Sequence, residues 1–235
     1  MFYTPINGIT WTIGGITTSQ FGIKALLNYK NNRNPIARIY GWLGIALGIG
    51  LFFFGIPALL TNNTDALKYT YFLADLFVQL CIQIQVCLLW FLLLRSFVKL
   101  RYLLLISTTF SAVLLVIQFL TSTAMLSASH NLVIYQDKPI VLILKSIIYI
   151  GVSFPVGFFF LRQIPNSPTL RSKFKSLFSG LIFLILSTAA TSNNLFDKGS
   201  DTVSSSLTLG VFFSLFIIVN SWPTKNLSTS KTKSR

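Results

Sequence analysis

Seven long apolar runs constrain the fold of this chain more than any other feature. A helix needs about 20 mainly apolar residues to cross a bilayer. The runs are approximately Thr4–Ile23, Ile36–Leu60, Thr70–Leu94, Tyr102–Leu126, Pro139–Leu161, Leu177–Asn193 and Ser204–Trp222. The first is rich in Gly, Thr and Ser and the sixth is short, so these two are the weakest. Together they predict an all-α, polytopic bundle of seven transmembrane helices in one domain, residues 1–222, followed by a disordered basic cytoplasmic tail, residues 223–235.

Composition agrees with a membrane protein. Only 10% of the residues are charged, against roughly 25% in soluble chains, and the mean hydropathy is +0.69. The net charge of +14 at first suggests nucleic-acid binding. However, the basic residues form short clusters between apolar runs, which favours contact with anionic lipids on the cytoplasmic side over nucleic acid.

The distribution of charge predicts the orientation. If the N-terminus is outside and the spans alternate, fifteen basic residues lie in the cytoplasm and three lie outside, as positive charge in cytoplasmic loops requires. The cytoplasmic set is Lys24, Lys30, Arg33, Arg38, Arg95, Lys99, Arg101, Arg162, Arg171, Lys173, Lys175, Lys225, Lys231, Lys233 and Arg235. The outer set is Lys68, Lys138 and Lys198, and four acids join it: Asp65, Asp137, Asp197 and Asp201. The C-terminus is therefore expected in the cytoplasm.

Two charged residues are expected inside the membrane. Asp75 lies in the third run and Lys145 in the fifth, each some six residues from the outer end. Ionisable side chains inside a bilayer are costly, so each is a candidate functional residue. At equal depth the two can form a structural ion pair or part of a ligand or ion site, or each can extend separately to the outer surface.

Three glutamines extend this polar region. Gln79 and Gln83 follow Asp75 at four-residue steps, so all three share one helix face. Gln118 lies in the outer half of the fourth run. With the polar end of the sixth run, these side chains either line a vestibule open to the outside or bond neighbouring helices together.

Glycine and proline predict where helices approach and bend. Gly44 and Gly48 form a GxxxG step in the second run, which allows close helix contact. An internal neighbour is the favoured partner, and a homodimer is the alternative. Pro155 in the fifth run is the predicted hinge, because proline interrupts helical hydrogen bonding.

The residues needed for familiar membrane chemistry are sparse. The chain has no glutamate and one histidine, His130, in an outer loop. With Asp75 as the single intramembrane carboxylate, no hydrolase set can be assembled, so we expect a non-enzymatic protein with no metal or cofactor. Cys81 and Cys87 are six residues apart on one helix and point in different directions, so no disulfide between them is expected.

One stretch resembles a known family. The segment Leu26–Leu60 contains Asn34-Pro35 and Ala37-Arg38 in a basic loop before a long apolar helix. In this it resembles the seven-helix membrane sensor domains of bacterial histidine kinases. No kinase domain follows the seventh run, so the resemblance implies a ligand-sensing or scaffold bundle that signals through a separate partner. It implies no functional residues.

The sequence therefore predicts a non-enzymatic, sensor-like or scaffold protein that recognises a small ligand or a membrane-protein partner. A small transporter, or the substrate-binding subunit of one, is the first alternative. An accessory subunit of a larger membrane complex is the second. The composition, rich in Asn, Lys and Ile, favours a bacterial plasma membrane as the location.

Overall fold

The computed structural model describes residues 5–127 and 132–195. Within these ranges the chain forms long α-helices and one antiparallel hairpin. The helices are α1 (Ile6–Asn32), α2 (Pro35–Leu60), α3 (Thr64–Leu89), α4 (Leu100–Thr121), α5 (Pro139–Arg162) and α6 (Leu170–Leu195). A π-helical turn, η1 (Trp90–Leu94), continues α3. The hairpin strands are β1 (Thr123–Ser127) and β2 (Leu132–Gln136).

Short asparagine-capped turns separate the first three helices. Asn34 accepts a hydrogen bond from the backbone N–H of Ile36, and Pro35 begins α2. Asn63 caps α3 in the same way, accepting from the N–H groups of Asp65 and Ala66. Side-chain oxygens at these positions satisfy amides that a helix start leaves unpaired. The chain therefore reverses sharply at both turns, and α1, α2 and α3 lie antiparallel.

Four of the described helices are long and apolar enough to cross a membrane. They are α2, α3 with η1, α4 and α5. Helices α1 and α6 have sufficient length but are less apolar, and they correspond to the two weakest predicted spans. Large apolar side chains such as Leu105, Ile106 and Leu120 of α4 are exposed. These features indicate a helical membrane protein. The seventh predicted run, Ser204–Trp222, and the tail lie outside the described residues.

The fourth predicted span is wrong at its C-terminal end. The sequence predicted a helix over Tyr102–Leu126, but α4 ends at Thr121 and residues 123–127 form β1. The pairing of Ala124 with Tyr135 and of Leu126 with Val133 explains the change. These apolar residues of β1 bury their side chains through the hairpin, which an apolar count cannot distinguish from a longer helix.

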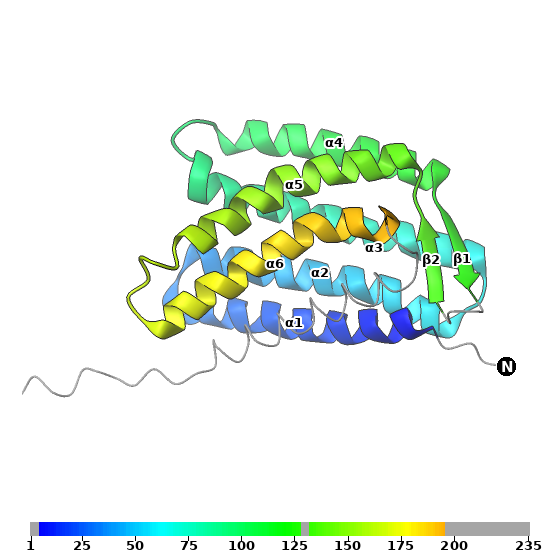
Figure 1. Ribbon diagram of the computed structural model, residues 1–235, viewed down its shortest axis with the longest axis horizontal. Helices are drawn as coiled ribbons and strands as arrows, with labels where there is room; N and C mark the ends of the chain where they lie inside the picture. The colour runs from blue at the N-terminus through cyan, green and yellow to red at the C-terminus, as the bar shows by residue number, and fades with distance from the viewer. Residues whose placement is uncertain (1–4, 128–131, 196–235) are drawn as a thin grey trace, which may run out of the picture.

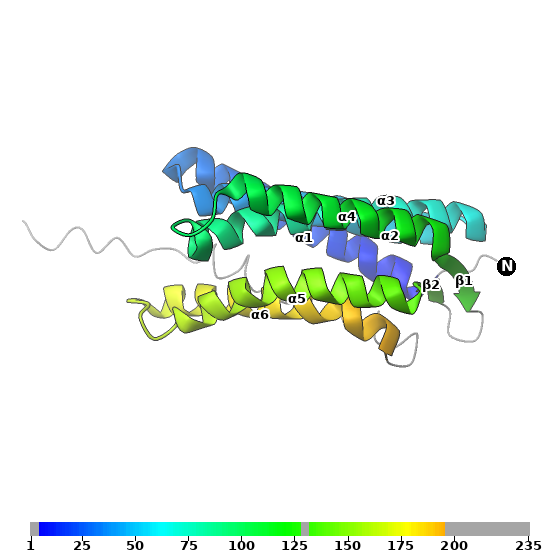
Figure 2. The same ribbon diagram turned by 90° about the horizontal axis from the view of Figure 1, so that it is seen from above.

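The helices form two layers of unequal size. Helices α1 to α4 make one layer, and α5 and α6 lie side by side in the other (Figures 1 and 2). The hairpin and the α2–α3 turn lie at one end of the molecule, called here the hairpin end. The connections at residues 33–34, 95–99 and 163–169 lie at the opposite end. We call this the basic end, because most lysines and arginines of the described residues gather there.

Glycines allow α1 and α2 to approach closely. A Cβ on Gly44 would lie 2.8 Å from the backbone of Gly22, and one on Gly48 would lie 3.0 Å from the backbone oxygen of Gly15. Such distances leave no space for a side chain. The partner of the predicted GxxxG step in this chain is therefore the internal neighbour α1.

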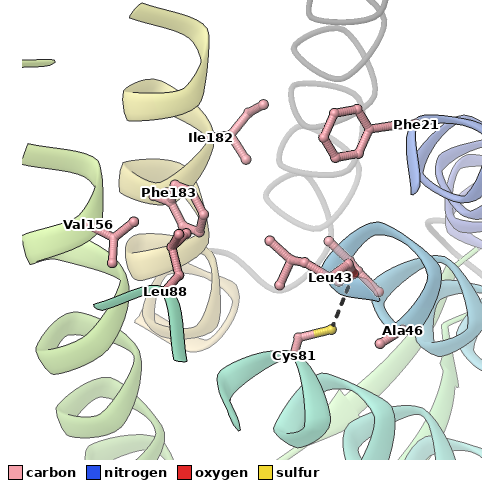
Figure 3. Packing of buried hydrophobic residues seen from close by; sticks show 9 residues of the cluster. Phe21, Leu43, Ala46, Cys81, Leu88, Val156, Ile182 and Phe183 are labelled. Carbon is pink, nitrogen blue, oxygen red and sulfur yellow. Dashed lines mark hydrogen bonds between the residues drawn. The ribbon is translucent and has the colours of Figure 1, made fainter. Parts of the chain in front are cut away.

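A buried apolar cluster joins both layers toward the basic end. Phe21 of α1 and Leu43 of α2 meet Val156 of α5 and Phe183 of α6 (Figure 3). Cys81 of α3 lies beside them, with its thiol 3.8 Å from the backbone oxygen of Leu43. Both cysteines are free, as their spacing predicted. The two buried charges of the helices, Asp75 and Lys145, lie on the hairpin side of this cluster.

Candidate functional site

Buried polar side chains follow one face of α3. Tyr71, Asp75, Gln79 and Gln83 recur every four residues, and the first three are buried. This spacing places side chains above one another along a helix. The face is directed between α4 and α5, as the contacts described below show. The sequence identified the last three positions, and Tyr71 extends the row by one turn toward the hairpin.

The two charges that the sequence predicted inside the membrane lie against one another. The Lys145 ammonium is 2.6 Å from Oδ2 of Asp75, and each side chain is only 6% exposed. The ammonium also donates a hydrogen bond of 3.2 Å to the hydroxyl of Tyr71. The sequence allowed a pair or two separately solvated side chains, and the geometry is that of a buried pair.

A second carboxylate completes the cluster. Oδ2 of Asp137 lies 2.7 Å from the same ammonium, and its side chain is 2% exposed. The Tyr71 hydroxyl donates to Oδ2 at 2.7 Å, and the Ser122 hydroxyl donates to Oδ1 at 2.5 Å. Asp75, Asp137 and Lys145 are called the charged triad below.

The sequence predicted an outer loop for Asp137, as for the other acids, and did not predict that its side chain is buried. The residue lies just before α5, and the hairpin turns it inward onto the bundle. One signal was present: Asp137 precedes Lys145 by eight residues, close to two helical turns. That spacing places the two side chains on one face only if the segment before Pro139 continues the direction of the helix.

Gln118 lies beside the triad with unused hydrogen-bonding capacity. Its side chain is fully buried and lies next to the Asp75 carboxylate. Among the described residues, neither its amide nitrogen nor its amide oxygen has a hydrogen-bond partner of regular geometry. Buried polar groups are nearly always paired, so each exception needs an explanation.

The other two glutamines bond helices together. Ser111 of α4 donates to Gln79 at 2.9 Å, and Gln79 donates to Tyr149 of α5 at 3.5 Å. Gln83 accepts from Ser107 at 2.5 Å and donates to Ser111 at 3.1 Å. These contacts fit the helix-bonding interpretation of the glutamines. In the sixth run, Ser187 is buried and bonds its own helix, and the polar side chains that follow it lie outside the described part of the chain.

The β1–β2 hairpin lies over the charged triad. Asn7 of α1 donates to the backbone oxygen of Val133 at 2.6 Å and accepts from its N–H at 3.2 Å. The ring of Tyr135 stacks on Tyr71, with centroids 4.4 Å apart and planes 6° from parallel. The strand is thus attached both to the start of α1 and to a residue of the site.

The predicted hinge lies in a continuous helix. Helix α5 runs from Pro139 to Arg162 without interruption at Pro155. Proline has no N–H, so the carbonyl four residues earlier, on Gly151, loses its helical donor. A Cβ on Gly151 would meet nothing within 4 Å. This part of α5 therefore has both a missing hydrogen bond and open space beside it.

Metal ligands of the usual kinds do not cluster in the described ranges. No group of three His, Cys, Asp or Glu side chains there could hold a metal ion. The triad instead offers two carboxylates, one ammonium and several hydroxyl and amide groups in a water-poor setting. Such a set can bind a small polar or charged group, and no nucleophile with an adjacent base is apparent among these contacts.

Comparison with known proteins adds no relative. No family model, curated protein or solved structure matches the chain.

Proposed function

We propose that this chain is a seven-span, non-enzymatic membrane protein that recognises a small ligand at the charged triad. In this proposal the hairpin end faces outward and the C-terminus lies in the cytoplasm. The observation that carries it is the burial of Asp75, Asp137 and Lys145 beneath an extramembrane hairpin. Charges buried at this depth are expensive and mark binding or transport sites more often than other positions do.

The arrangement supports sensing because the site contacts an element outside the predicted spans. Asp137 directly follows β2, and Tyr135 of β2 stacks on Tyr71. A ligand that changed the contacts of the triad would therefore change the contacts of the hairpin. The resemblance of Leu26–Leu60 to bacterial sensor domains points the same way, with the signal passing to a separate membrane partner.

The distribution of charge supports the orientation. In the described residues, eleven lysines and arginines lie toward the basic end: Lys24, Lys30, Arg33, Arg38, Arg95, Lys99, Arg101, Arg162, Arg171, Lys173 and Lys175. Two others, Lys68 and Lys138, lie at the hairpin end. Basic residues favour the cytoplasmic, anionic face of a bacterial plasma membrane.

Cysteine labelling tests the orientation. In intact cells, a membrane-impermeant maleimide should label a Lys138→Cys variant directly. A Lys99→Cys variant should react only after the membrane is permeabilised. The unsubstituted chain is the control, because Cys81 is buried but Cys87 is only partly buried. Labelling in the opposite order would reject the orientation.

A thermal-shift screen tests the site. The purified chain is heated with a panel of amines, amino acids and inorganic cations, and the Tm of the wild type is compared with that of Asp75→Asn. A compound that raises the wild-type Tm should lose its effect in the variant, because the charge it would contact is gone. A shift that persists in Asp75→Asn would place the ligand elsewhere and refute the proposal.

A small transporter is the second candidate, favoured by one observation. Polar contacts continue from the triad along α3 to Gln79 and Gln83, toward the middle of the helix. Reconstitution into liposomes separates the two functions. Uptake of a screened compound above that of empty vesicles would favour transport, and binding without uptake would favour sensing.

A further inference from the structure

The charged triad is not electrically balanced. Two carboxylates face one ammonium, and all three side chains are buried. Lys138 is adjacent in sequence, but it is exposed to solvent. The start of α5 adds only the partial positive charge of a helix N-terminus, close to Asp137. The described residues therefore leave about one excess negative charge in a water-poor site, which is costly unless something offsets it.

The two carboxylates differ in how well they are satisfied. Asp137 receives the Lys145 ammonium and two hydroxyl donors, from Tyr71 and Ser122. Asp75 has the Lys145 ammonium at 2.6 Å and the Gln118 amide beside it, and no described hydroxyl donates to it. An ionised carboxylate offers about four acceptor positions. The unmet negative charge thus lies at Asp75 rather than at Asp137.

Gln118 marks the same location independently. Its amide is buried beside Asp75, and its oxygen has no donor among the described residues. The Gln118 side chain contacts Asp75 as a hydrogen-bonding amide. Rotation about its terminal bond would turn the amide oxygen toward this carboxylate, which gives a pair of hard oxygen ligands. Such ligands suit alkali and alkaline-earth cations, whereas soft metals prefer sulfur and imidazole.

We propose that Asp75 and the amide oxygen of Gln118 bind one monovalent alkali cation at the hairpin end of α3 and α4. This inference rests on the proposed function and names the class of ligand that the triad takes. One added positive charge, together with that of Lys145, balances the two carboxylates. A divalent ion would leave an excess positive charge in its place. Ion binding neutralises Asp75 without displacing Lys145 from Asp137.

The first test measures the binding of sodium to the full chain in detergent. Radioactive sodium should bind saturably, at about one ion per chain, and unlabelled sodium should displace it. Replacing choline chloride by sodium chloride at constant ionic strength should raise the Tm by roughly 5 °C at saturation. The same measurement in lithium chloride and potassium chloride ranks the alkali cations by the Tm shift that each produces.

Two variants connect binding to the site. Gln118→Leu removes one oxygen ligand without altering charge, and it should weaken sodium binding at least about tenfold. Asp75→Asn removes the excess charge and should abolish the sodium-dependent shift. The matched control is Gln85→Leu, because Gln85 is an equally buried glutamine of α3 that bonds Ser153, away from the triad. It should lower the Tm in both salts and keep the sodium shift.

Several results would overturn the inference. One is an equal Tm in choline, lithium, sodium and potassium, as expected if a proton or a water molecule satisfies Asp75. Another is sodium binding that survives both Gln118→Leu and Asp75→Asn. If no alkali ion binds but an organic compound shifts the Tm through Asp75, the cation inference fails while the proposed recognition site stands.

Discussion

Replacing Lys145 by methionine removes the single positive charge of the triad and keeps most of the side-chain volume. At 2.6 and 2.7 Å, two unit charges attract by about 6 kcal/mol at an effective dielectric constant of ~20. Desolvation of each ion offsets several kcal/mol of this attraction. Removing one partner nevertheless leaves the other charges buried and unpaired, so Lys145→Met should cost about 3–5 kcal/mol in free energy of unfolding.

The assay is reversible unfolding of the purified chain in mixed micelles, followed by tryptophan fluorescence. Lys68→Met is the matched control, because Lys68 lies at the same end, is only half-buried and forms neither of the salt bridges seen in the described residues. A charge near the surface contributes less than about 1 kcal/mol. Asp137→Asn should cost less than Lys145→Met, since it leaves a balanced pair of Asp75 and Lys145. The reasoning is refuted if Lys145→Met lies within 1 kcal/mol of its control, or if Asp137→Asn is the more harmful change.

Three further changes test other contacts. Gly44→Ala should destabilise the chain by about 1–3 kcal/mol, because the new Cβ would lie 2.8 Å from the backbone of Gly22; equal stability would contradict the α1–α2 contact. Gly151→Ala, with nothing within 4 Å, should be neutral or stabilising by up to about 1 kcal/mol, and a clear loss would contradict that open space. Asn7→Leu should speed amide exchange at Val133, measured by mass spectrometry, because two hydrogen bonds are lost; unchanged exchange would count against attachment of the hairpin to α1.

The sequence predicted that Asp75 and Lys145 could pair, because counting along the apolar runs places them at the same level of the bundle. It did not predict the inward position of Asp137. That position depends on the hairpin, which pairs residues across a loop and brings the start of α5 over the bundle. Charge counting treats every loop acid as solvated, so it cannot identify one that a folded loop buries.

For the helices too, the sequence indicated which residues make contacts but not which partners they contact. Gly44 and Gly48 predicted a close approach, but the partner emerged only from the contacts with α1. The glutamines predicted polar contacts on one face of α3, and their serine partners on α4 depend on which helix lies opposite. The end of α4 was misplaced because Thr123–Leu126 is apolar enough to extend a helix, and strand pairing decides otherwise.

The attachment of the hairpin to α1 has a consequence for the order of folding. The glycine contacts of α1 and α2 join neighbouring segments and can form as soon as both are synthesised. The bonds between Asn7 and Val133 span 126 residues, so the Asn7 amide has no such partner until more than half of the chain has been made. Contacts of this range carry a large closure entropy and form late. We therefore expect the N-terminal turn of α1 to make its contact with the hairpin late in folding. Asp75 likewise has no ion-pair partner until the segment that contains Lys145 has been made.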